Sequence, residues 1–110
     1  MRALVLSAAL FAAAATADQV DHGRAVAVEA CSACHKVTAA QPSPPPVADT
    51  DERAYVPAPS FASIARGKAS DAALRRAITD PKHPMREQDW LPADLGAVVA
   101  YIRSLHSAKW

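Results

Sequence analysis

Two cysteines and a histidine lie within five consecutive residues near the amino end of the chain, in the segment Cys31-Ser32-Ala33-Cys34-His35, and the sequence holds no other cysteine. A disulfide between thiols so close in sequence would close a very small ring and constrain little of the unfolded chain. A thiol-exchange motif requires a strand-helix-strand setting, of which the sequence gives no sign. A structural zinc site needs four ligands and would have to recruit a distant histidine.

Covalent attachment of haem would use all three of these side chains. Two thiols add to the two vinyl groups of one porphyrin, and a histidine directly after the second thiol lies beneath the iron and can bind it. Thioether linkage also keeps the haem from being lost outside the cell. We therefore interpret Cys31 and Cys34 as the attachment residues of one haem c, and His35 as a ligand of its iron.

The amino-terminal segment has the pattern of an export signal. Arg2 gives it a positive start, residues 3–14 form an apolar run with a single polar residue, and residues 15–17 read Ala-Thr-Ala, which a signal peptidase accepts. An uncleaved membrane anchor is the alternative, but the run is shorter than the ~20 residues that a spanning helix needs. We expect a signal peptide at residues 1–17 and one periplasmic domain at residues 18–110, without a membrane span.

The charge balance bears on the class of partner. The chain has 12 Lys and Arg and 11 Asp and Glu. One of the basic residues, Arg2, lies in the predicted signal, so the mature polypeptide is close to neutral. Nucleic-acid binding needs a basic face, and we expect no such partner. A domain this small is marginal on its own apolar surface and usually needs a metal, a disulfide or a cofactor, a part that haem would fill.

The second axial ligand of the iron separates electron transfer from ligand chemistry. Met85 is the single methionine after the predicted signal, and it lies in the polar stretch "PKHPMREQ" rather than on an apolar helix face, where core methionines are expected. His83 is chemically able to bind iron as well. Pro84 stiffens the loop between them, so we expect only one of the two to reach the metal. We favour Met85, partly from ligand chemistry and partly from the family resemblance below.

Periodic small and apolar positions predict a helix at each end of the mature chain. The first helix has one face of small side chains, at Val20, Gly23, Ala27 and Ala30, and runs directly into Cys31. Pro92 can open the last helix. An apolar stripe follows it, at Leu95, Val98, Val99, Ile102 and Leu105, with Tyr101 at one edge. We expect the two helices to cross at Gly23.

The region between these helices is less regular. Ser70 is placed to cap a short helix that runs through Thr79 and ends at Asp80-Pro81. Residues 36–59 carry no periodicity and include "QPSPPP", which predicts an irregular, partly extended surface loop. A structureless loop of this length is plausible if it wraps a haem edge. For the proline-rich residues 42–46 the sequence indicates only local stiffness.

Taken in order, these segments resemble the class I (mitochondrial-type) bacterial c-type cytochromes, which carry a single haem. The resemblance rests on "GRAVAVEACSACH", then "APSFASIA", then "HPM" followed by "LPADLGAVVAYIRSL". It implies an all-α cytochrome c fold, in which small helices wrap one covalent haem and the terminal helices cross. It also implies that the carbonyl of Pro59 accepts a hydrogen bond from the far ring nitrogen of His35, and that Phe61 lies against the haem.

One position departs from that family. Its members often have an aromatic residue in the first helix four positions after the glycine, where this chain has Ala27. Either Tyr101 fills that space or the helix crossing is looser.

An iron with two axial ligands has no open position, which favours one-electron exchange between Fe(III) and Fe(II). We therefore expect a monomeric electron carrier, not an enzyme, with His35 and Met85 as axial ligands and a positive reduction potential. Its partners would be redox proteins such as a dehydrogenase or an oxidase. Lys36, Lys82 and Arg86 would surround the exposed haem edge and steer an acidic partner, although scattered solvated charge is the simpler explanation in a near-neutral chain.

Two alternatives from other classes stay open. The chain would serve as a haem c subunit permanently docked to a dehydrogenase if Tyr55, Trp90 and Trp110 were interface anchors rather than core or chain-end residues. It would serve as a gas sensor or a peroxidase-like protein if the distal site were open or its ligand labile.

Overall fold

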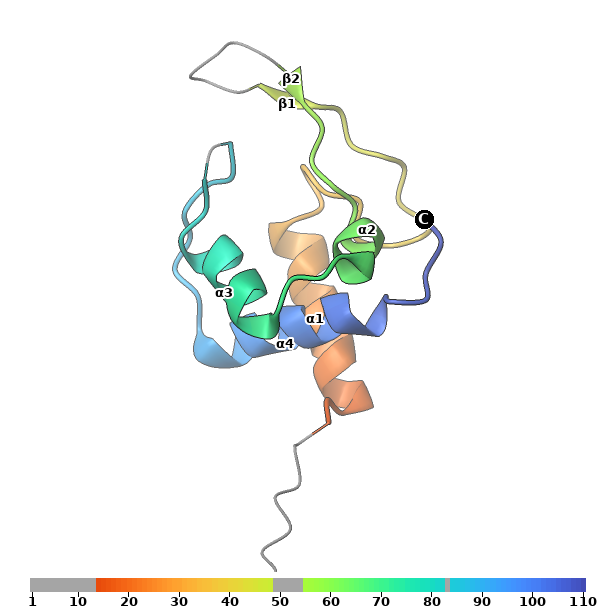
Figure 1. Ribbon diagram of the computed structural model, residues 1–110, viewed down its shortest axis with the longest axis vertical. Helices are drawn as coiled ribbons and strands as arrows, with labels where there is room; N and C mark the ends of the chain where they lie inside the picture. The colour runs from red at the N-terminus through yellow and green to blue at the C-terminus, as the bar shows by residue number, and fades with distance from the viewer. Residues whose placement is uncertain (1–13, 49–54, 83) are drawn as a thin grey trace, which may run out of the picture.

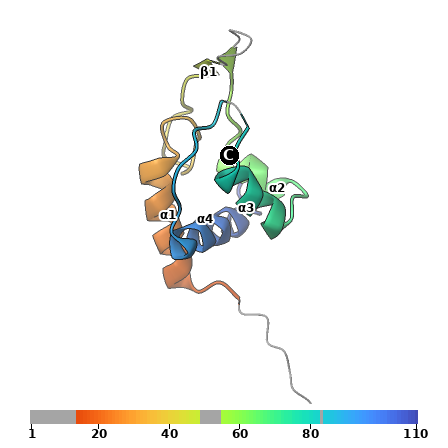
Figure 2. The same cartoon turned by 90° about the vertical axis from the view of Figure 1, so that its left-hand side faces the viewer.

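Four helices and one short ladder make up the part of the chain that the computed structural model describes, which is residues 14–48, 55–82 and 84–110. Helix α4 is central, because it contacts each of the other three helices. Figures 1 and 2 show α1 on one side of α4, and α2 and α3 on the other. The elements follow the order α1 (Ala17–Ala30), β1 (Val47–Ala48), β2 (Tyr55–Val56), α2 (Phe61–Arg66), α3 (Asp71–Thr79) and α4 (Pro92–Ser104).

The crossing of the two terminal helices lies at Gly23, as the sequence predicts. A Cβ atom at this position would collide with the backbone carbonyl of Ala97 and come within 2.9 Å of the Tyr101 Cβ. Ala27, one turn further along α1, is completely buried. Small side chains on α1 therefore let the backbones of α1 and α4 come into direct contact, which places the end of α1 against the core.

Replacing Gly23 with alanine is expected to destabilise the protein by about 2–3 kcal/mol, because overpacking against backbone atoms cannot be relieved by a rotamer change. Chemical denaturation measures this loss. Gly96→Ala is the matched control, since a Cβ there has its nearest neighbour at 3.7 Å. Alanine is also favoured over glycine within a helix by roughly 0.8–1 kcal/mol, so Gly96→Ala should be neutral or stabilising. Equal effects of the two substitutions would contradict the close crossing.

Tyr101 belongs to the same buried cluster as Ala27. Its side chain is 5% exposed, and its hydroxyl donates a hydrogen bond to the Val37 carbonyl. Burial raises the pKa of Tyr101, against a smaller lowering by Arg24, so the hydroxyl remains a donor at neutral pH. The apolar stripe of α4 is confirmed: Val98, Val99 and Ile102 are buried, and Leu95 and Leu105 are half-buried.

The short third helix is also confirmed at both ends. The Ser70 side chain caps α3 by accepting from the Ala73 N–H at 3.1 Å, and the helix ends at Thr79, with Asp80 as its C-cap before Pro81. An ion pair between Arg103 and Asp71, at 2.6 Å, joins α3 to α4. Leu74 is buried on the face of α3 that meets the core.

The long loop contains more regular structure than the sequence predicts. Val47 and Ala48 pair with Val56 and Tyr55 in a two-residue antiparallel ladder. The all-α fold class stands, with this ladder as an addition at one end of the molecule, beyond the carboxyl end of α1 (Figure 1). Helix α2 was not predicted either, although Ser60 caps it by accepting from the Ser63 N–H at 3.1 Å.

None of the helices in the described ranges has both the length and the apolar character that crossing a bilayer requires.

Candidate haem site

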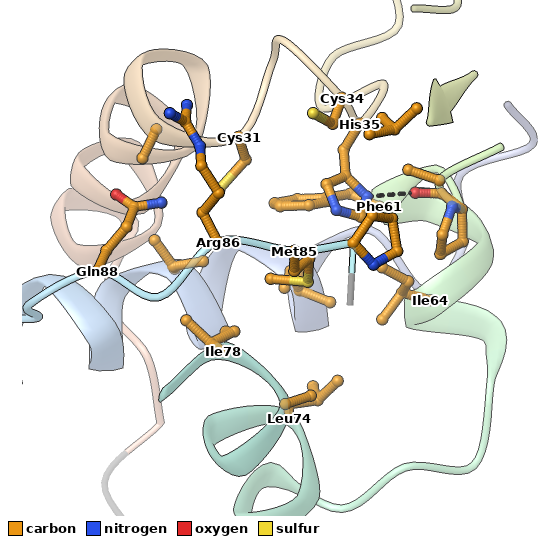
Figure 3. A pocket seen from close by; sticks show the side chains of 18 of the residues that line it. Cys31, Cys34, His35, Phe61, Ile64, Leu74, Ile78, Met85, Arg86 and Gln88 are labelled. Carbon is orange, nitrogen blue, oxygen red and sulfur yellow. Dashed lines mark hydrogen bonds between the residues drawn. The ribbon is translucent and has the colours of Figure 1, made fainter. Parts of the chain in front are cut away.

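A pocket of about 560 Å³ opens in the middle of the fold, and both cysteines and His35 line it. Figure 3 shows Cys31 and Cys34 at one side, where α1 ends, with Leu74 and Ile78 of α3 across the pocket. Phe61 and Ile64 of α2, together with Val98 and Ile102 of α4, complete the apolar lining. An apolar cavity that presents two thiols and an imidazole fits a porphyrin ring with thioether links.

A single turn after α1 brings the three motif residues together. The Cys31 N–H closes the last turn of α1 by donating to the Ala27 carbonyl at 2.8 Å. The Cys31 carbonyl then accepts from the N–H groups of Cys34 and His35, at 3.2 and 2.9 Å. Because the turn continues the helix, the side chains of positions 31, 34 and 35 face one cavity.

The His35 ring is held in one tautomer. The side chain is buried, and its Nδ1 lies 2.7 Å from the Pro59 carbonyl oxygen. A carbonyl oxygen can only accept, so Nδ1 carries a proton, and in the neutral form of the ring the lone pair lies on Nε2. The Phe61 ring packs at 5.5 Å from the imidazole, centroid to centroid. The hydrogen bond to Pro59 that the family resemblance implies is thus present.

The two thiols are free and half-buried. Burial raises the pKa of Cys31 to about 11, and the nearby Cys34 adds to the rise. The Cys31 thiol is therefore protonated at neutral pH.

Met85 lies in the segment between α3 and α4 and lines the same pocket as His35 (Figure 3). Its side chain is 40% exposed, and its N–H donates to the Lys82 carbonyl at 3.2 Å. His83, the competing candidate, lies outside the described residues. The structure therefore brings together Cys31, Cys34, His35 and Met85, all four residues that the sequence singles out for the site.

The three cations predicted to surround the pocket have different positions. Lys82 and Arg86 line it, with Gln88. Lys36 instead donates to the carbonyls of Ala39 and Gln41, and its Nζ lies 5.7 Å from the Trp110 ring centroid. Lys36 is therefore not among the residues that line the pocket, unlike Lys82 and Arg86.

A sequence model described as cytochrome c matches residues 20–106, which is most of the chain. The chain belongs to the cytochrome c family. Its cofactor is haem c, attached covalently through Cys31 and Cys34, and the protein functions in electron transport. Proteins of this family are typically electron carriers rather than enzymes.

Among solved structures, the c-type cytochrome SorU from Sinorhizobium meliloti is similar to this cytochrome, with a TM-score of 0.52 and 20% sequence identity. The match covers 80% of this chain and 91% of that chain. At this identity the likeness concerns the fold alone. No curated protein matches the sequence.

Ile64 and Gln41 are among the contributors to the site that the sequence analysis missed. Ile64 of α2 lines the pocket three positions after Phe61, and a helical spacing from the Ser60 cap would have revealed it. Gln41 contacts the backbone of the attachment turn through its side chain. Its place next to a proline run gave no sign of this, because the interaction depends on how the loop folds back.

Proposed function

We propose that this cytochrome carries single electrons, with the iron of its haem held between His35 Nε2 and Met85 Sδ. The observation that supports this most directly is the 2.7 Å hydrogen bond from His35 Nδ1 to the Pro59 carbonyl, which leaves the Nε2 lone pair available in the pocket. The haem supplies one-electron exchange at its iron. The chain binds it, orients the ligands and excludes water.

The Pro59 carbonyl strengthens His35 as a donor, because a hydrogen bond that pulls on the Nδ1 proton makes Nε2 more basic. The apolar lining around the ring excludes water and disfavours the more charged ferric state. Both a thioether ligand and this burial favour the ferrous state, so we infer a positive reduction potential.

The two cationic side chains that line the pocket support the proposal that the partners are acidic redox proteins, such as a dehydrogenase or an oxidase. Lys82 and Arg86 line the pocket that the haem would occupy. Opposite charge on a partner would steer it toward these side chains and speed association. Trp90 and Trp110 are half-buried and pack against the core, which supports a freely diffusing monomer over a permanently docked subunit.

Reversing these two charges is expected to slow electron transfer to an acidic redox protein. The double variant Lys82→Glu with Arg86→Glu should lower the second-order rate at low salt by on the order of tenfold, since steering of this kind changes on-rates by about 10–10³. The wild-type rate should fall as ionic strength rises. Stopped-flow mixing measures both. Lys68→Glu, an exposed charge outside the pocket lining, is the control and should have little effect.

We also propose that residues 1–17 are removed during export and that the mature protein works in the periplasm. Support comes from the sequence pattern, since residues 1–13 lie outside the described part. Cleavage after Ala17 would remove the Thr16 side chain, which caps α1 by accepting from the Gln19 N–H at 3.1 Å. Asp18 would stay in the first turn and favour the helix dipole. The amino-terminal sequence of the exported protein tests this proposal.

One observation favours the second candidate, a protein with a labile distal site. Met85 is 40% exposed, in a segment without helix or strand. Carbon monoxide added to the reduced protein separates the two functions. An electron carrier with bound Met85 should show an unchanged spectrum, and its ferric form should show the weak long-wavelength band of iron-thioether coordination. Rapid carbon monoxide binding would instead assign the protein to ligand chemistry.

A further inference from the structure

Both the nitrogen and the oxygen of the Gln41 side-chain amide form hydrogen bonds with the backbone of the attachment segment. Its Nε2 donates to the carbonyls of Ser32, at 2.8 Å, and His35, at 3.0 Å. Its Oε1 accepts from the Val37 N–H at 2.8 Å. One side chain thus holds backbone groups on both sides of Cys34, and one of them belongs to His35.

These backbone groups need hydrogen-bond partners from outside the helix because they lie beyond the last turn of α1. Val37 has no exposed surface, so its N–H would otherwise be buried without a hydrogen bond, at a cost of about 1–3 kcal/mol. The next two carbonyls have different partners: that of Lys36 accepts from the Phe61 N–H at 3.0 Å, and that of Val37 accepts from the Tyr101 hydroxyl.

Gln41 is itself held in place on both sides. Its N–H donates to the Thr38 carbonyl at 3.3 Å, which closes a turn, and its carbonyl accepts from Lys36 Nζ. Pro42 follows directly, and a residue before proline is restricted to extended conformations. The first proline of the run therefore limits the backbone freedom of Gln41, and Lys36 anchors it.

We propose that Gln41 is a positioning residue that fixes the direction in which His35 presents its imidazole to the iron. Pro59 holds the ring end of His35 through Nδ1, and Gln41 holds its backbone end through the carbonyl. With both ends fixed, the ring has one orientation in the pocket. This inference rests on the proposed function, because it requires His35 as the iron ligand.

Two substitutions, made in the haem-loaded protein, distinguish the hydrogen bonds that Gln41 donates from the one that it accepts. Gln41→Met keeps the length and volume of the side chain and removes all three hydrogen bonds. Gln41→Glu keeps an acceptor for the Val37 N–H but sets a carboxylate oxygen against the carbonyls of Ser32 and His35. Tyr101→Phe is the control, because it removes a hydrogen bond to the same segment, at the Val37 carbonyl, without touching His35.

Proton NMR of the reduced and ferric proteins gives the decisive readouts: the ring signals of His35 and the exchange rate of the Val37 amide. We expect the His35 ring signals to move in both Gln41 variants and to stay in place in Tyr101→Phe. The Val37 amide should exchange on the order of tenfold faster in Gln41→Met and remain protected in Gln41→Glu, since one lost buried hydrogen bond is worth about that factor.

Unchanged His35 signals in the Gln41 variants, or an equal displacement in Tyr101→Phe, would overturn the proposal. If Gln41→Met does not accumulate with haem, the His35 ring signals of Gln41→Glu and Tyr101→Phe are compared instead, and the same two outcomes support or overturn the proposal. The wild-type spectrum separates this proposal from the proposed function. If His35 in the wild type shows no signals of an iron-bound imidazole, the ligand assignment itself fails, whatever the variants do.

Discussion

Replacing both attachment cysteines, Cys31→Ala together with Cys34→Ala, is expected to give a chain without covalent haem that no longer unfolds cooperatively. The pocket of about 560 Å³ would lose the group that fills it. At roughly 24 cal/mol per Å³, an empty cavity of this size would cost on the order of 10 kcal/mol, an upper bound because the pocket is open to solvent. Even part of that bound is a large share of the whole stability of a typical domain, about 5–15 kcal/mol.

Thermal unfolding followed by circular dichroism measures this effect, and the haem content of the exported protein accompanies it. Ser32→Ala is the matched control, because Ser32 lies between the two cysteines and its hydroxyl only donates to the Val28 carbonyl. It should keep its haem and melt near the wild type. A double-cysteine variant that remains folded with a sharp transition would show that the haem is dispensable for the core.

Replacing Met85 with alanine is expected to lower the reduction potential by on the order of 100 mV or more, since the choice of axial ligand tunes haem potentials over about 0.8 V. The sulfur ligand would be lost, the ferric long-wavelength band would disappear, and carbon monoxide would bind to the reduced iron. Redox titration and the optical spectrum measure these changes.

His83→Ala is the matched comparison, because His83 is the other candidate ligand in the same segment. If Met85 binds the iron, this variant keeps the wild-type potential and spectrum. The reverse pattern, with His83→Ala altering the spectrum and Met85→Ala leaving it intact, would assign the distal position to histidine.

The features predicted correctly from the sequence are those encoded by local spacing. The attachment turn follows from residues 31–35, and the cap of α3 follows from Ser70. The crossing at Gly23 was also predicted, because a row of small residues on one helix and an apolar stripe on another leave few ways to pack. Two helices that must bury these faces meet where the side chains are smallest.

The features that were missed depend on contacts between distant segments. A two-residue ladder at Val47 and Ala48 is too short to leave an alternating pattern. The contacts of Lys36 with the carbonyls of Ala39 and Gln41 and its position near the Trp110 ring could not be read from its place beside His35. Gln41 itself resembles any polar loop residue until the loop folds back on the turn.

The mass and extractability of the haem in the purified, exported protein test the central claim most directly. The account predicts a polypeptide heavier by the mass of one haem, which stays attached through denaturation and acidic solvent extraction and is located by peptide mapping on Cys31 and Cys34. A colourless protein with the mass of the bare polypeptide and a cooperative melting transition would contradict it.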